Sequence, residues 1–68
     1  MNEDVLNTSV RRFLKTVGVT SQREIEKAVR AAVASGKLKG NEGLPAKMTL
    51  TVGGISLTHT IDDRIELE

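Results

Sequence analysis

The fold of this chain depends on one stretch, "GVTSQREIEKAVRAAV", which runs from Gly18 to Val33. Ser21 and Glu24 stand three residues apart in it, which is the spacing of a capping box at a helix N-terminus. Beyond them, apolar residues recur at the spacing of one helical face. The residues on this face are Ile25, Ala28, Val29, Ala32 and Val33. The stretch therefore predicts a turn at Gly18 and a helix over residues 22–35.

Upstream of this stretch, the sequence predicts another helix over residues 4–17. Asn2 offers a side-chain acceptor where that helix begins, and two acidic residues follow it, as a helix N-terminus favours. Gly18 would end this helix, and Gly36 would cap the C-terminus of the following one. The apolar residues of the first helix also share one face: Val5, Leu6, Val10, Phe13, Leu14 and Val17.

Downstream, the apolar period changes from helical to alternating in "KMTLTVGGISLTHTI", residues 47–61. Gly53–Gly54 is typical of a two-residue hairpin turn, and it predicts strands over residues 46–52 and 55–61. This turn would pair Val52 with Ile55 and Met48 with His59. A second turn of three residues is predicted at Asp62–Arg64, leading into a third strand over residues 65–67.

The predicted fold is therefore α+β, a single domain over residues 1–68 with the order α-α-β-β-β. A two-helix hairpin would pack on the apolar face of a three-stranded antiparallel meander. The chain has no cysteine and a single aromatic residue, so disulfides cannot stabilise a core and its volume must come from Val, Ile, Leu and Ala. Self-association would add stability, through a strand edge or residual apolar surface, and we expect a homodimer as one outcome.

Charge separates along the chain. Residues 1–40 hold eight Lys/Arg and four Asp/Glu, a net +4, whereas residues 41–68 hold two and five, a net −3. We expect any contact surface to lie on the outward side of the two helices, formed by Arg11, Lys15, Arg23, Lys27 and Arg30. Two hypotheses stay open for it. The first is binding of a protein partner or of a second copy, without catalysis.

The second hypothesis is DNA binding, with the second helix acting as the recognition helix of a helix-turn-helix. Two features count against it. Glu24 and Glu26 flank the basic residues and weaken their field, and only two helices are predicted where the motif usually lies among three. A protein-interaction module is therefore the preferred function, and a regulatory DNA-binding protein is the alternative.

The sequence offers no constellation that points to catalysis, a cofactor or a metal. His59 is the only imidazole, and its predicted register places it between Met48 and Leu67 on the inner face of the sheet, where it would pack. The N-terminal residues are acidic and lack a long apolar run. We therefore expect a non-enzymatic protein without a membrane span, located in the cytoplasm.

Residues 13–54, "FLKTVGVTSQREIEKAVRAAVASGKLKGNEGLPAKMTLTVGG", resemble a small family of uncharacterised bacterial proteins of about this length. The similarity extends from "MNEDV" to "IELE". The resemblance implies a bacterial, cytoplasmic protein that stands alone. The family has no assigned activity, so the resemblance supplies no functional residues.

Overall fold

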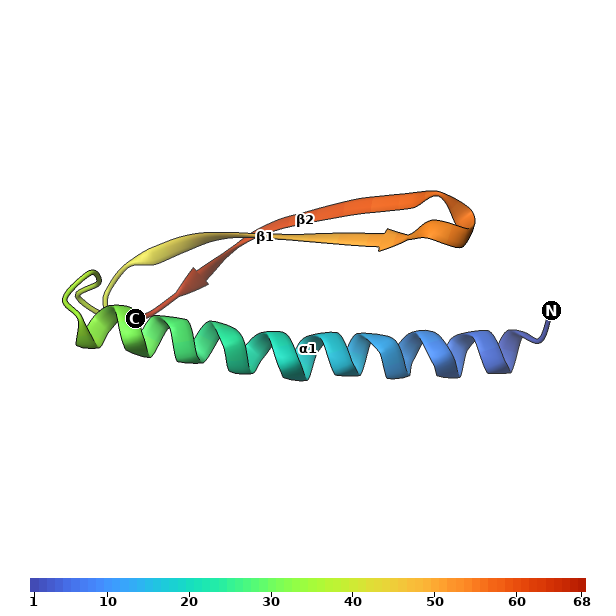
Figure 1. The fold of residues 1–68 in the computed structure, drawn as a ribbon, viewed down its shortest axis with the longest axis horizontal. Helices are drawn as coiled ribbons and strands as arrows, with labels where there is room; N and C mark the ends of the chain where they lie inside the picture. The colour runs from blue at the N-terminus through green and yellow to red at the C-terminus, as the bar shows by residue number, and fades with distance from the viewer. The chain divides into compact units, whose positions relative to one another are not determined.

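The computed structural model describes residues 1–68 and contains one helix and one two-stranded sheet (Figure 1). Helix α1 runs from Glu3 to Ala34, strand β1 from Gly43 to Val52 and strand β2 from Leu57 to Glu66, with a short 3-10 turn, η1, at Gly53–Ile55. The predicted order α-α-β-β-β is therefore wrong, and the observed order is α-β-β. The chain divides into two compact units, Met1–Lys37 and Leu38–Glu68.

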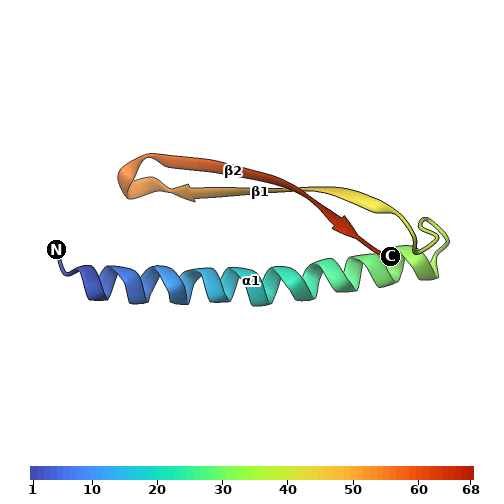
Figure 2. The ribbon, with the colours of Figure 1, turned by 180° about the vertical axis from the view of Figure 1, so that it is seen from behind.

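A single helix of 32 residues replaces the two helices predicted over residues 4–17 and 22–35. The ribbon of α1 continues without a break from end to end (Figure 2). Gly18 lies within this helix, and its φ is outside the left-handed region that a helix-ending glycine adopts. A glycine inside a helix costs about 1 kcal/mol relative to alanine. A break would cost more, because it would create two new helix ends with up to four unpaired backbone groups each.

The hydroxyl side chains near Gly18 bond within the helix instead of capping a new one. Thr20 Oγ1 donates to the Thr16 carbonyl at 2.7 Å, and Thr16 Oγ1 donates to the Arg12 carbonyl at 3.2 Å. Ser21 lies inside α1, so the Ser21–Glu24 capping box is not used. The spacing of a capping box was present, but the helix on its N-terminal side left no free N–H groups to cap.

Both predicted outer ends of the helical region are confirmed. Asn2 is the N-cap, and its Oδ1 accepts from two backbone N–H groups of the first turn at 3.0 and 3.1 Å. At the other end Gly36 has a φ of +83° and donates to the Val33 carbonyl, while the Lys37 N–H reaches the Ala32 carbonyl at 2.9 Å. These paired bonds around a left-handed glycine form a Schellman motif, which satisfies carbonyls that α1 leaves open.

In the second unit β1 and β2 pair antiparallel over their whole length, and both ribbon views show them side by side. The pairing is shifted by two residues from the predicted register. Val52 pairs with Leu57 rather than Ile55, because the connection has four residues instead of two. Ser56 closes it with a φ of +51° and donates its N–H to the Gly53 carbonyl at 3.2 Å. An even shift leaves the paired residues on their predicted faces, but Ile55 leaves the predicted strand and becomes part of η1.

The predicted turn at Asp62–Arg64 and the third strand over residues 65–67 are wrong. β1 begins at Gly43, earlier than predicted, so it provides strand partners for the whole Asp62–Arg64 segment. Lys47 lies directly opposite Asp62 in this pairing. The two aspartates therefore continue β2 because the ladder offers them partners.

No residue of the chain is buried. Neither the helical unit nor the hairpin unit therefore has a buried core of its own. No stretch of α1 combines the length and apolarity that a bilayer-spanning helix requires.

Candidate interaction faces

The continuous helix aligns apolar residues of both its halves into one row, which we call the apolar stripe. Successive members are three or four residues apart, and the pattern repeats every eleven residues, as from Leu6 to Val17 to Ala28. Eleven residues in three turns is close to the 3.6 residues per turn of an α-helix, so the stripe runs nearly straight. The apolar stripe consists of Leu6, Val10, Leu14, Val17, Ser21, Ile25, Ala28 and Ala32.

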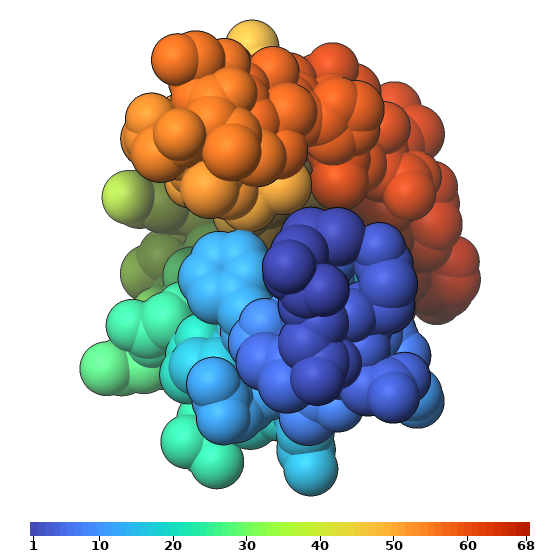
Figure 3. Space-filling view, turned by 90° about the vertical axis from the view of Figure 1, so that its right-hand side faces the viewer, coloured from blue at the N-terminus to red at the C-terminus, as the bar shows by residue number.

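The large members of the apolar stripe are open to solvent. Leu6 is 43% exposed and Leu14 52%, and neighbouring Phe13 is 50% exposed. In the space-filling view the first turns of α1, in blue, face the viewer at the surface of the molecule (Figure 3), and residues 1–8 are all exposed. An amphipathic helix is normally stabilised by packing of its apolar side, and α1 by itself does not supply that packing.

The predicted basic contact surface does not form one patch on α1. At about 100° per residue, Arg11 and Lys15 lie roughly 100° around the helix from the group of Arg23, Lys27 and Arg30. The five residues were expected on the outer side of two antiparallel helices, where a turn would have brought them together. A single helix leaves them on two sides and spreads them along its axis.

A narrower basic stripe does exist, and it includes a residue that the sequence analysis missed. Arg12 shares its angular position with Arg23 and Arg30, and Lys27 lies beside them, on the side of α1 roughly opposite the apolar stripe. Arg12 was missed because the two halves were treated as separate helices. Its eleven-residue distance from Arg23 is the signal that could have found it.

Few carboxylates neutralise these cations. Arg30 lies 3.9 Å from Glu26, whose carboxylate also accepts from Gln22 Nε2 at 3.2 Å. The Arg30 side chain is 76% exposed, and solvent-exposed pairs of this kind contribute about 0–1 kcal/mol. Arg12, Arg23 and Lys27 have no carboxylate within 4.0 Å.

The hairpin also has one apolar and one polar face. Its apolar face includes Leu50 and, directly across from it, His59. The prediction that placed His59 between Met48 and Leu67 is wrong, because of the two-residue shift and because Leu67 lies beyond β2. The polar face is dominated by hydroxyl groups, with Thr49, Thr51, Thr58 and Thr60 forming two cross-strand pairs. A two-stranded hairpin by itself is only marginally stable in water, so its apolar face needs a packing partner.

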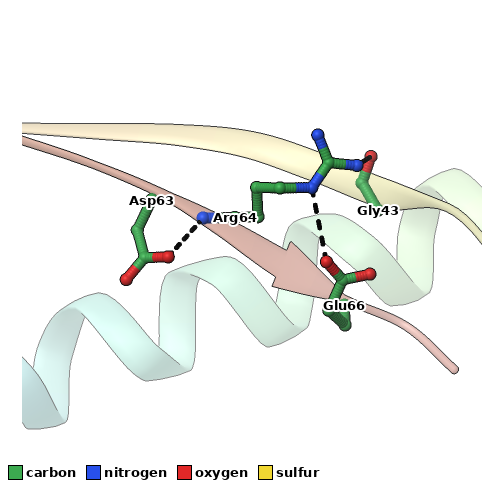
Figure 4. A network of polar contacts seen from close by, with 4 residues as sticks. All are labelled: Gly43, Asp63, Arg64 and Glu66. Atoms are coloured by element: carbon green, nitrogen blue, oxygen red, sulfur yellow. Dashed lines mark hydrogen bonds and ion pairs between the residues drawn. The ribbon is translucent and has the colours of Figure 1, made fainter.

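Arg64 joins the two strands at the open end of the hairpin (Figure 4). Its Nη2 donates to the Gly43 carbonyl at 3.1 Å, and its Nε donates to Glu66 Oε1 at 3.3 Å. A Cβ on Gly43 would collide with the Arg64 guanidinium, so glycine is what allows this close approach. The Asp63 carboxylate accepts the Arg64 backbone N–H at 2.8 Å.

Glu42 organises the loop before β1. Its carboxylate accepts the backbone N–H groups of Lys39, Gly40 and Asn41 at 2.8, 3.0 and 3.2 Å. These donors, that of Lys39 foremost, lower the pKa of the Glu42 carboxyl because they stabilise its charged form. The Glu42 carbonyl also accepts the Leu67 N–H at 3.1 Å, which extends the ladder past β2.

The structure gathers no three His, Cys, Asp or Glu residues at one point. Depressions on α1 lie between side chains of adjacent turns, as does one lined by Asp4, Val5, Thr8, Ser9 and Arg12. The features that stand out are therefore surfaces. They are the apolar stripe, the basic stripe and the apolar face of the hairpin.

These features define a small α-β-β protein that consists of an amphipathic helix followed by a hairpin. The chain belongs to the family described as "Family of unknown function (DUF6494)", whose model matches residues 1–68. The resemblance to a small uncharacterised family is thus confirmed. No curated protein and no solved structure matches the chain. The family supplies no activity that could be assigned to particular residues.

Proposed function

We propose that the chain is a non-catalytic protein-interaction module, which works in the cytoplasm as the sequence predicts and associates with a second copy of itself. One observation carries the proposal: no residue is buried, although both units present apolar faces. Apolar surface of this extent is favourable to remove from water, and on monomeric proteins large exposed patches mark interaction sites.

Each unit offers apolar side chains for association. Leu14 of α1 and Ile61 of β2 are each 52% exposed. A standard interface buries about 800 Å² on each partner, so a face that extends along most of α1 is of the length that such an interface needs.

The alternative, DNA binding through a helix-turn-helix, loses its geometric basis because α1 has no turn at Gly18. The basic stripe lies roughly opposite the apolar stripe, so it would stay accessible in a self-associated protein. Its function as a contact surface remains a prediction.

Sedimentation equilibrium of the full chain tests the proposal. We expect a mass of twice 7.4 kDa or more at micromolar concentration. Leu14→Glu, which places a charge in the apolar stripe, should give a monomer. Thr8→Glu adds the same charge away from the stripe and is the matched control, which should still associate. A folded wild-type chain that sediments as a monomer up to hundreds of micromolar would refute the proposal.

A further inference from the structure

We propose that two copies pair through the apolar stripes of α1 in antiparallel orientation. The N-terminal half of each helix would lie against the C-terminal half of the other. This inference rests on the proposed function, and it adds the surface and the orientation of the pairing.

The distribution of side-chain size along the apolar stripe favours this orientation. The N-terminal half carries Leu6, Val10 and Leu14, whereas the C-terminal half ends in Ala28 and Ala32. Parallel helices would place large residues against large at one end and alanine against alanine at the other. Because the distance between helix axes depends on the residues at the contact, such a pair would splay apart.

Antiparallel helices place large residues opposite small ones at both ends of the stripe, and they bring Leu14 beside Ile25 of the second copy between these ends. When the stripes are centred on each other, Leu6 lies opposite Ala32 of the second copy and Val10 opposite its Ala28. Facing positions that alternate large and small side chains interdigitate at the packing density of a protein core. The stripe runs from Leu6 to Ala32, which is 27 residues and roughly 39 Å of helix, so the contact is long.

The charges at the two ends of α1 favour the same orientation. The helix begins with Glu3 and Asp4, and Lys37 and Lys39 follow its end. None of these four side chains has an ion-pair partner within the chain. Antiparallel pairing brings the acidic end of each copy to the basic end of the other and opposes the two helix dipoles, whereas parallel pairing brings like charges together.

The eleven-residue period makes such a contact continuous. A stripe with seven-residue spacing drifts around the helix in one sense and favours a left-handed supercoil, whereas an eleven-residue repeat drifts in the opposite sense, by about 20° per repeat, and favours a right-handed one. A slight right-handed supercoil therefore keeps the apolar stripes of the two copies in contact along α1.

Cysteine cross-linking tests the orientation, since the natural chain has no cysteine. Val10→Cys and Ala28→Cys variants are mixed, treated with a short bismaleimide and analysed by mass spectrometry, which separates the mixed product from each self-product. We expect the mixed product to dominate by at least tenfold. Thr8→Cys mixed with Arg30→Cys is the control, because these residues have the same axial alignment but lie away from the apolar stripe and should not cross-link.

The other outcomes separate this inference from the proposed function. Self-products at both Val10→Cys and Ala28→Cys would show parallel pairing and overturn the inference, leaving self-association intact. If the protein associates but gives neither the mixed product nor the self-products, its interface lies outside the apolar stripe. This result would also overturn the inference. A monomer in sedimentation would overturn the proposed function together with the inference.

Discussion

Replacing Gly18 by alanine should stabilise the protein, and the sign of this effect tests the continuous helix. Gly18 lies in the middle of α1 with a φ outside the left-handed region, and a Cβ built on it meets no atom within 4 Å. Alanine is favoured over glycine inside a helix by about 1 kcal/mol. If the chain turned at Gly18, the left-handed conformation of a helix-ending glycine would make alanine unfavourable by a similar amount.

The assay is urea unfolding followed by far-UV circular dichroism, at one protein concentration because association also contributes to stability. With a urea dependence of about 1–3 kcal/mol/M, a gain of about 1 kcal/mol raises the midpoint by roughly half a molar. Gly36→Ala is the matched control: with a φ of +83° it should lower the midpoint. A lower midpoint for Gly18→Ala would refute the continuous helix.

Three further predictions concern the hairpin, its loop and the basic stripe. Since the lowered pKa of Glu42 reflects its backbone donors, the stabilisation by its carboxylate should be complete above the ordinary carboxyl pKa and be lost as pH falls through the lowered value. A carbon-13 titration of the Glu42 carboxyl measures this, and a midpoint at the ordinary value would contradict it. Gly43→Ala should cost about 0.5–1 kcal/mol in the natural chain but almost nothing beside Arg64→Ala, because the new Cβ displaces the Arg64 side chain. Equal costs in both backgrounds, measured by urea unfolding, would rule out this coupling. Finally, labelled duplex DNA should remain unbound by micromolar protein at physiological salt. Binding that weakens steeply with salt and is reduced by Arg23→Ala and Lys27→Ala would instead support the DNA-binding alternative.

The ends of α1 could be predicted from the sequence, but its continuity was not. Asn2 and Gly36 act locally, and their chemistry specifies a cap wherever a helix reaches them. The capping-box spacing at Ser21 gave an equally local signal, which the hydrogen bonds of the surrounding helix outweigh. A longer-range signal was available: the stripe continues in phase across Gly18, from Val17 through Ser21 to Ile25 in steps of four.

The alternation of apolar and polar residues along β1 and β2 assigned the two faces of the hairpin correctly. It could not fix the register of their pairing. Gly53–Gly54 suits a two-residue turn, yet the observed connection uses Ser56 in a left-handed conformation that serine seldom adopts. The Asp62–Asp63 pair is typical of a turn in isolation. The two aspartates stay in β2 because β1 is long enough to pair with them: Lys47 lies opposite Asp62.

The candidate surface was predicted only in part, because its arrangement depends on whether α1 is continuous. Residue types alone identified the cations of α1, but their arrangement depends on whether the chain turns between Lys15 and Arg23. Without a turn they divide between two sides of one helix, and Arg12 joins the side that holds Arg23. The apolar stripe was divided in the prediction as well, so its full length could not be recognised.

The eleven-residue period also limits how α1 can change in length during evolution. Adding or removing one residue would rotate everything beyond it by about 100° and carry the apolar residues of that part off the stripe. A change of seven or eleven residues would rotate it by only about 20°, so it would keep the pattern and alter only the reach of the helix. Insertions and deletions that survive in this segment should therefore come close to whole numbers of turns.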